Sequence, residues 1–305
     1  MGGICVSVVV CTHDRPAYLA ACLESLAAQR APPSAFELLV VDSASPEDGA
    51  AAIAALAERH GARRLVAAKP GLSLARNLGA AAASGRWLAY IDDDAVADPG
   101  WVDAIIAAGS TLPEPAALGG KILPRYEAPL PTWWPEGLVG VLTVLTHDRA
   151  GTVGVDLPRG IEPYGANFIV RADALAAIGG FPEGLGRIGT RLLSNEESLV
   201  LRRLADAGGR IAYDPAIVVT HSIQAERLSP AWLLRRQFWQ GVSAARLSHI
   251  LGQGAAAWAE APRRLLAGLV YAPLLLLPAT ATAQLVRRAR AAYSWGFLRG
   301  LLAGA

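Results

Sequence analysis

Residues 4–16 read ICVSVVVCTHDRP, and this stretch decides the fold. The β-branched run Ile4–Val10 predicts a strand buried on both faces, as strands of a parallel sheet are. The polar segment Thr12–Arg15 breaks this run, and Pro16 suits the first turn of a helix. Apolar residues then recur with the spacing of one helix face, so a strand followed by a helix opens the chain.

The same alternation continues along the first third of the chain. Further strands are expected at 36–41, 64–67 and 87–91, and further helices at 47–60 and 71–84. Strands that alternate with helices predict an α/β fold, in which helices cover both faces of a parallel sheet.

The middle of the chain is expected to be less regular. Residues 110–160 contain seven prolines and predict a loop-rich segment. Order is expected to return at 165–171, 194–207 (a helix), 211–213 and 217–220 (two strands).

Composition excludes several classes of protein. The 305 residues are 53% hydrophobic and 18% charged, which excludes a disordered chain. The net charge of +2 predicts no nucleic-acid partner. Three cysteines without a CxxC pair argue against a disulfide framework and a zinc site, and they favour a reducing compartment. Because the start lacks the pattern of a signal peptide, a cytoplasmic location is expected.

The C-terminal region differs from the rest. Residues 261–305 hold six arginines and no acid, and Leu265–Val286 is a run of 22 residues without charge. Basic residues flank this run and Pro273 and Pro278 interrupt it, which favours a helical hairpin seated in a membrane over a single span. A packed helix or a homodimer contact is the alternative. We therefore expect a domain at 1–228 and a helical, membrane-associating extension at 229–305, bound peripherally or monotopically to the inner face of the cell membrane.

Polar side chains follow every expected strand. Because ligands bind at the carboxyl ends of parallel strands, these residues favour one shared site. Each of them alone also suits a turn or a helix cap. The residues concerned are Thr12, His13, Asp14 and Arg15, then Asp42 and Ser43, then Lys69, Arg76 and Asn77, and last Asp92, Asp93 and Asp94.

The triple aspartate is the most informative feature. In a strand, Asp92 and Asp94 point the same way, and two carboxylates on one face repel unless a cation lies between them. Oxygen ligands suit Mg²⁺ or Mn²⁺, which commonly also hold substrate phosphates. A solvated acidic turn, or a cap for a helix near residue 100, is the alternative. Neither GxGxxG nor GxxxxGK[ST] follows a strand, which disfavours a dehydrogenase and a P-loop NTPase.

Several motifs together resemble glycosyltransferase family 2, in particular its inverting, non-processive bacterial members. The resemblance covers about residues 4–225 and implies a GT-A fold, a Rossmann-like sheet with flanking helices. It also implies transfer of a single sugar from a nucleotide-diphosphate sugar to an acceptor hydroxyl, with Mn²⁺ or Mg²⁺ as cofactor. The motifs are VVVCTHDR (8–15), LVVDS (39–43), GLSLARNLG (71–79), YIDDD (90–94), GANFIVR (165–171), GGF (179–181), and NEE (195–197) with LADAG (204–208).

The resemblance implies a role for each matching residue. Asp42 would contact the nucleotide base with Thr12 and Asp14 beside it, and UDP is the favoured nucleotide, with GDP and dTDP left open. Asp94 would be the direct metal ligand. The remaining expected roles are Arg15, Arg76, Asn77, Asp92 and Asp93 near the nucleotide sugar, Asp92 and His221 in the metal site, and Glu197 as the catalytic base.

Some of these residues also have a plainer interpretation. The family motif is Glu-Asp, and here its second residue is Glu197, which is one methylene longer. Ser194 and Glu197 also fit a capping box, so Glu197 could simply satisfy a backbone N–H. His221 could be structural.

The acceptor is the least determined part of the reaction. Trp133, Trp134 and Glu196 are candidates for acceptor binding, although tryptophans also fill cores or press on membranes. In the segment RRQFW at 235–239, Phe238 stands where processive synthases have arginine, which argues against polymer synthesis. The basic, apolar extension favours a lipid-linked or membrane-associated acceptor.

Two rival functions stay open at this point. A nucleotidyltransferase would use the same aspartate pair but release pyrophosphate. A non-catalytic module would bind the sugar nucleotide without turnover.

Overall fold

The computed structural model describes residues 5–304 apart from 111–113, 159 and 275–279. The chain forms two compact units. Unit 1 comprises residues 1–125, 143–183 and 197–222, and unit 2 comprises 126–142, 184–196 and 223–305. Unit 2 therefore takes two segments from the middle of the chain besides the C-terminal region, and the single boundary at residue 228 stays a prediction.

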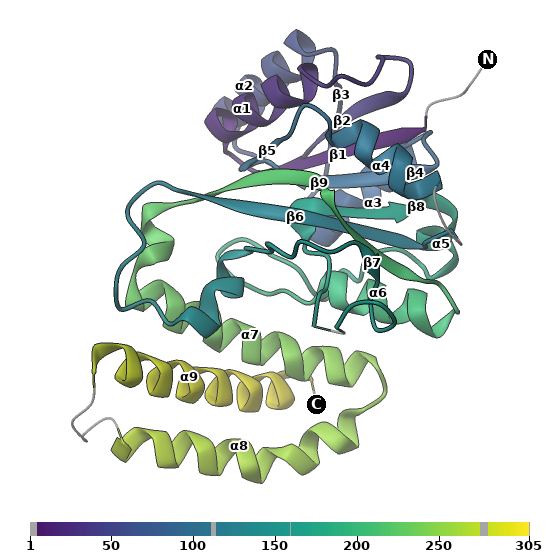
Figure 1. The fold of residues 1–305 in the computed structure, drawn as a ribbon. Helices are drawn as coiled ribbons and strands as arrows, with labels where there is room; N and C mark the ends of the chain where they lie inside the picture. Colours follow the sequence, from purple (N-terminus) through teal and green to yellow (C-terminus); the bar gives the residue numbers. More distant parts are fainter. Residues whose placement is uncertain (1–4, 111–113, 159, 275–279, 305) are drawn as a thin grey trace. The chain divides into compact units, whose positions relative to one another are not determined.

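Unit 1 is built on a mixed sheet (Figure 1), whose strands lie in the order β3-β2-β1-β4-β8-β6-β9-β5, with β7 paired to β9. The first four strands in this order are parallel, and the pairs β4–β8, β6–β8, β5–β9 and β7–β9 are antiparallel. The strands are β1 (Val6–Thr12), β2 (Phe36–Asp42), β3 (Arg63–Val66), β4 (Trp87–Asp92), β5 (Ala95–Ala97), β6 (Ala117–Tyr126), β7 (Gly151–Thr152), β8 (Phe168–Arg171) and β9 (Ile211–Ile223).

Helices pack on both faces of this sheet, because its central strands are apolar on both sides. In β1, Val8 and Val10 enter one core, and Val9 enters the other. The first core is closed by α1 (Pro16–Ala27), α2 (Glu47–Arg59) and α4 (Trp101–Ser110). The second is closed by α3 (Leu72–Ala82), α5 (Ala172–Ala177) and α6 (Glu196–Asp206).

The structure confirms one expectation and corrects two. The four strands expected in the first third of the chain pair in parallel, and antiparallel pairs extend the sheet beyond β4. The expected loop region contains β6, a largely buried strand of ten residues whose glycines and proline hide it in the sequence. The two strands expected at 211–213 and 217–220 are one strand, β9, which continues through Pro215.

The first strand is shifted relative to the prediction. It begins at Val6 and ends at Thr12, two residues later than expected, and Ile4 lies outside the described residues. The other strands and helices expected between residues 36 and 91 agree with the structure to within one or two residues, whereas β5 was not expected.

Unit 2 is helical, as expected for the C-terminal region. Its long helices are α7 (Pro230–Ile250), α8 (Gly254–Leu274) and α9 (Ala281–Gly304), preceded by the 3-10 segment η1 (Glu136–Leu142). Helix α9 packs against both α7 and α8 (Figure 1). Gly241 on α7 and Gly296 on α9 permit this approach, because a Cβ at either position would meet the backbone of the other helix.

The uncharged run at 265–286 is divided between α8 and α9, and its residues 275–279 lie outside the described part of the chain. Among the described helices, none combines the length and the apolarity that crossing a membrane requires.

Asn167 joins three elements of unit 1 from a fully buried position. Its Nδ2 donates to the carbonyl oxygens of Lys121 in β6 (3.1 Å) and Ile217 in β9 (2.9 Å). Its Oδ1 accepts a hydrogen bond from Nε1 of Trp101 in α4 at 2.9 Å. One side chain therefore satisfies three buried polar groups.

We predict that Asn167→Leu lowers the free energy of unfolding by about 3 kcal/mol, because an indole N–H and two carbonyl groups lose their partner inside the core. Denaturant unfolding followed by circular dichroism measures the change. Glu183→Gln, at an exposed position, should stay within about 0.5 kcal/mol of the wild type. A loss for Asn167→Leu no larger than that of the control would contradict this account.

Candidate functional site

The carboxyl ends of three parallel strands lie side by side in unit 1. Thr12 at the end of β1 is opposite Asp42 at the end of β2, and Cys11 of β1 is opposite Asp92 at the end of β4. The sheet register thus brings together the strand-end residues that the sequence singled out.

Arg15 neutralises two of the three neighbouring aspartates. Its Nη1 lies 2.6 Å from Oδ1 of Asp93, and its Nη2 lies 2.8 Å from Oδ2 of Asp94. The hydroxyl of Thr12 donates to the other oxygen of Asp93 at 2.7 Å. Burial raises the pKa of Asp93 well above its usual range, although the Arg15 charge opposes the rise.

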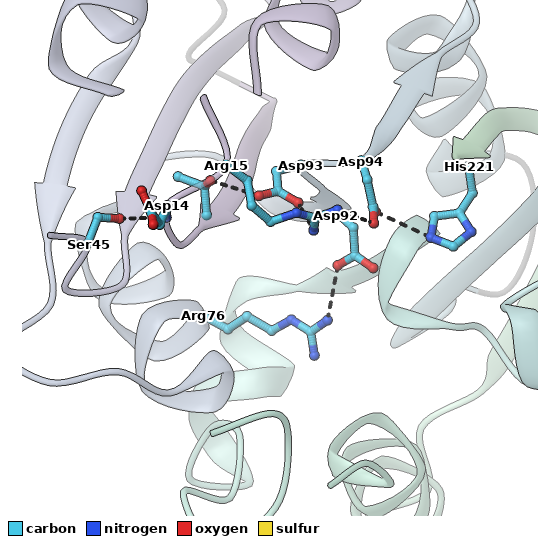
Figure 2. A network of polar contacts seen from close by, with 9 residues as sticks. Asp14, Arg15, Ser45, Arg76, Asp92, Asp93, Asp94 and His221 are labelled. Atoms are coloured by element: carbon cyan, nitrogen blue, oxygen red, sulfur yellow. Dashed lines mark hydrogen bonds and ion pairs between the residues drawn. The ribbon is translucent and has the colours of Figure 1, made fainter. Parts of the chain in front are cut away.

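Asp92, Asp94 and His221 form a cluster that could hold a metal ion. One ligand atom of each residue lies within 4.8 Å of the others. His221 comes from β9, where it pairs with Ala95, and its Nε2 lies 3.3 Å from Oδ1 of Asp94. Figure 2 shows the three side chains turned toward one another beside Arg15.

The donor set of this cluster fits a divalent cation. Two carboxylates and an imidazole are ligands that Mn²⁺ accepts readily, and Mg²⁺ prefers the carboxylates. Nδ1 of His221 is buried and has no hydrogen-bond partner among the residues that the structure describes. Asp92 and His221 lie 129 residues apart in the chain, and the fold brings both of them beside Asp94. Their role as metal ligands, which the resemblance implies, stays a prediction.

Arg76 connects this cluster to Glu197. The guanidinium is only 2% exposed, and it packs against the rings of Tyr90 and Phe181. Its Nη1 lies 2.9 Å from Oε1 of Glu197, and its Nη2 lies 3.7 Å from Oδ1 of Asp92. One buried cation thus holds the expected base and the end of β4 together.

The capping-box interpretation of Glu197 loses support. Helix α6 begins at Glu196, and the backbone N–H of Ser194 donates to Oγ of Ser243 at 3.0 Å. The N–H that a capping box would offer to Glu197 is therefore already used, and the carboxylate is bound by Arg76 instead.

Asp42 is fully buried at the end of β2 and is held as an anion. Its two oxygens accept from the backbone N–H of Ser45 at 3.0 Å and from Arg64 at 2.7 Å. Burial alone would raise the pKa of Asp42, but the bonds from Ser45 and Arg64 lower it below its usual value. Asp14, which comes after β1, has a left-handed backbone conformation with φ of 51°, and its N–H donates to Oγ of Ser45.

Not every expected residue is available to a ligand. Asn77 uses both ends of its amide on the backbone of Phe181, at 2.8 Å each, so its role near the nucleotide stays a prediction. Trp133, Trp134 and Glu196 belong to unit 2, where the two indole rings lie 5.6 Å apart, and their role with an acceptor stays a prediction.

Sequence reasoning missed the residues that position the site. Arg64 and Ser45 hold Asp42, and the rings of Tyr90 and Phe181 hold Arg76. Arg64 lies in a predicted strand parallel to that of Asp42, and this was the one available signal for their contact.

Comparison with known proteins bears on this site. The family described as Glycosyl transferase family 2 matches residues 7–152. The Glucosyl-dolichyl phosphate glucuronosyltransferase of Haloferax volcanii is 29% identical over 246 residues, which cover 78% of this chain and 75% of that protein. The Succinoglycan biosynthesis protein ExoM of Rhizobium meliloti is 29% identical over 247 residues, which cover 79% and 74%.

Solved structures share the fold. One is the mannosyltransferase PcManGT from Pyrobaculum calidifontis in complex with GDP-Man and Mn²⁺. It has a TM-score of 0.61 at 18% sequence identity, and the match covers 97% of this chain and 88% of that one. S. aureus TarS 1–349 in complex with UDP-GlcNAc has a TM-score of 0.59 at 17% identity, with 96% and 90% covered. The fold of this chain is therefore the GT-A fold.

We predict that Asp94→Asn abolishes the binding of Mn²⁺, because the central carboxylate of the cluster loses its charge. The loss of the free-ion signal in electron paramagnetic resonance measures binding during a titration. Asp48→Asn removes the same charge from the exposed first turn of α2 and should leave binding unchanged. Equal binding by Asp94→Asn and the wild type would refute the cluster as a metal site.

We predict that Arg15→Gln tightens the binding of Mn²⁺ by on the order of tenfold in the absence of donor. The guanidinium occupies Asp94, and charges a few ångström apart interact by ~1–4 kcal/mol near a protein surface. Calorimetric titration measures the change, with Arg59→Gln on exposed α2 as the control. Weaker binding by Arg15→Gln would show that Arg15 supports the cation instead of competing with it.

Proposed function

Because this chain is a glycosyltransferase that carries a family 2 domain, we propose that it transfers a single sugar from a nucleoside-diphosphate sugar to an acceptor hydroxyl with inversion at the anomeric carbon. The observation that carries the proposal is the position of Arg76. This buried cation contacts Asp92 at the end of β4, where we place the metal, and Glu197 at the start of α6. The proposed base lies on one side of this guanidinium and the proposed site of the leaving group on the other, an arrangement that suits an in-line displacement.

Glu197 acts as the base in this proposal. Its carboxylate takes the proton of the acceptor hydroxyl while the oxygen attacks the anomeric carbon. The bond from that carbon to the diphosphate breaks, and the nucleoside diphosphate leaves with the bonding electrons. A single displacement inverts the carbon, so no covalent sugar–enzyme intermediate is needed.

Asp92, Asp94 and His221 would hold the divalent cation, Mn²⁺ or Mg²⁺. When bound, such a cation neutralises charge that develops on the leaving diphosphate. The residues of the chain hold these ligands in place. Arg15 holds Asp93 and Asp94, and Arg76 holds Asp92.

The nucleotide would lie along the ends of β1 and β2. Asp42 is buried and anionic there, and its carboxylate suits the N–H groups of a base. Thr12, Asp14, Arg15, Asn77 and Asp93 are the other residues that we propose near the nucleotide sugar. UDP is the favoured nucleotide. Solved neighbours of the same fold are described as complexes with GDP-Man and with UDP-GlcNAc, which supports a nucleoside-diphosphate sugar without choosing the base.

The acceptor in this proposal is lipid-linked or membrane-associated. Support comes from the name of one relative, which contains a dolichyl phosphate, and from the arginine-rich unit 2. We place the enzyme peripherally on the inner face of the cell membrane, with Trp133, Trp134 and Glu196 in acceptor binding.

We predict that Glu197→Gln lowers kcat by about 10²–10⁴-fold while the donor still binds, because only the proton acceptor is lost. Release of nucleoside diphosphate from a UDP-sugar with Mn²⁺ measures turnover, and calorimetry measures donor affinity. Glu183→Gln, exposed in unit 1, is the matched control.

Two results would contradict this proposal. Unchanged turnover in Glu197→Gln would show that Glu197 is not the base. Release of pyrophosphate in place of nucleoside diphosphate would assign a nucleotidyl transfer instead.

A further inference from the structure

Unit 2 contains a cavity of about 530 Å³ that the proposed transfer reaction does not use. It lies between α7, α8, α9 and the η1 segment, and its lining residues all belong to unit 2. This volume is in the range of pockets that bind small organic molecules.

The lining has two chemical parts. Leu138, Ala267, Val286 and Ala289 provide an apolar wall. Arginines and the hydroxyl-bearing rings of Tyr271 and Tyr293 provide the polar part, so the cavity suits a ligand that is anionic at one end and hydrocarbon at the other.

The three lining arginines differ in how far their charge is already satisfied. Arg264 pairs with Glu260 at 2.9 Å and lies over the rings of Tyr293 and Phe297, which fixes α8 against α9. Arg290 donates to the hydroxyl of Tyr271 at 3.2 Å, which is a neutral partner. The guanidinium of Arg263 has neither a hydrogen bond nor an ion pair with any residue that the structure describes.

The outer side of α8 is apolar and exposed. Leu265, Leu266, Leu269 and Val270 are between 43% and 62% exposed, and Trp258 lies two turns earlier on the same side. Arg264, Ala267 and Tyr271 recur on the opposite side, toward the cavity. A helix with one apolar exposed face and arginines beside it is typical of helices that lie in a membrane interface.

The charge of this region favours an anionic lipid over a second copy of the chain. Residues 223–305 contain ten arginines and two glutamates. Two such surfaces would repel each other, whereas anionic headgroups attract clustered arginines.

We propose that the cavity of unit 2 binds the phosphate headgroup of an anionic membrane lipid. Arg263 and Arg290 bind the phosphate oxygens, and the hydrocarbon next to the headgroup lies against Leu138 and Val286. This inference goes beyond the proposed reaction and does not rest on it, because every residue concerned lies in unit 2.

The test is calorimetric titration of the full-length protein with dihexanoyl phosphatidic acid below its micelle concentration. We expect saturable binding by the wild type, and binding at least tenfold weaker in Arg263→Gln/Arg290→Gln. The matched control, Arg288→Gln/Arg299→Gln, removes the same charge from exposed positions of α9 outside the cavity and should bind like the wild type.

A second variant, Ala267→Phe, fills the cavity without a change of charge and should also weaken binding at least tenfold. Far-ultraviolet circular dichroism verifies that each variant keeps its helices. Dihexanoyl phosphatidylcholine and inorganic phosphate, tested at the same concentrations, should not bind.

Several results would overturn the proposal. If phosphatidylcholine bound equally well, the anionic charge of the headgroup would not be what the cavity recognises. If inorganic phosphate bound equally well, the hydrocarbon would not contribute to binding. Equal loss in both double variants would indicate a diffuse charge effect, and displacement of the lipid by UDP would assign the cavity to the donor. A thermal-shift measurement with UDP and Mn²⁺ on the same protein separates this test from that of the proposed function. Lipid binding without a thermal shift would count against the proposed donor site and leave the lipid site supported.

Discussion

The acidic end of β4 is the constraint on which the rest of unit 1 depends. Three successive carboxylates lie there, and Asp93 and Asp94 are only 4% exposed. Buried charges without partners cost several kcal/mol each, so the fold must bring cations to this point. The cations are Arg15, from the turn after β1, and Arg76, from α3, and together they contact all three aspartates (Figure 2). Nε2 of His221, from β9, also lies beside Asp94.

The same partners explain why the site suits group transfer. Charges fixed before the substrate arrives need no reorganisation during the reaction, which is how enzymes stabilise charge that develops on a leaving group. Arg76 holds two carboxylates of the site, because it contacts Asp92 on one side and Glu197 on the other. The distance between the expected base and the expected metal site is therefore set by one buried side chain instead of by flexible loops.

Much of this could be predicted from the sequence, because parallel strands with continuous β-branched runs are easily recognised and their carboxyl ends must meet. Strand β6 could not, since Gly119, Gly120 and Pro124 break its apolar pattern, and neither could its place in the sheet between β8 and β9. The contact of Arg76 with Glu197 joins residues 121 positions apart, and no local spacing encodes it. A capping box and a catalytic glutamate look alike in the sequence, and only the partner of Ser194 separates them.

The central claim is that the end of β4 binds a divalent cation together with the diphosphate of a sugar nucleotide. The most direct measurement is the melting temperature of the protein with UDP-, GDP- and dTDP-sugars, each with and without Mn²⁺. A ligand that binds only the folded state raises that temperature by mass action. This account predicts a rise with one class of nucleotide that depends on Mn²⁺. A well-folded protein whose melting temperature responds to none of the three donors would contradict it.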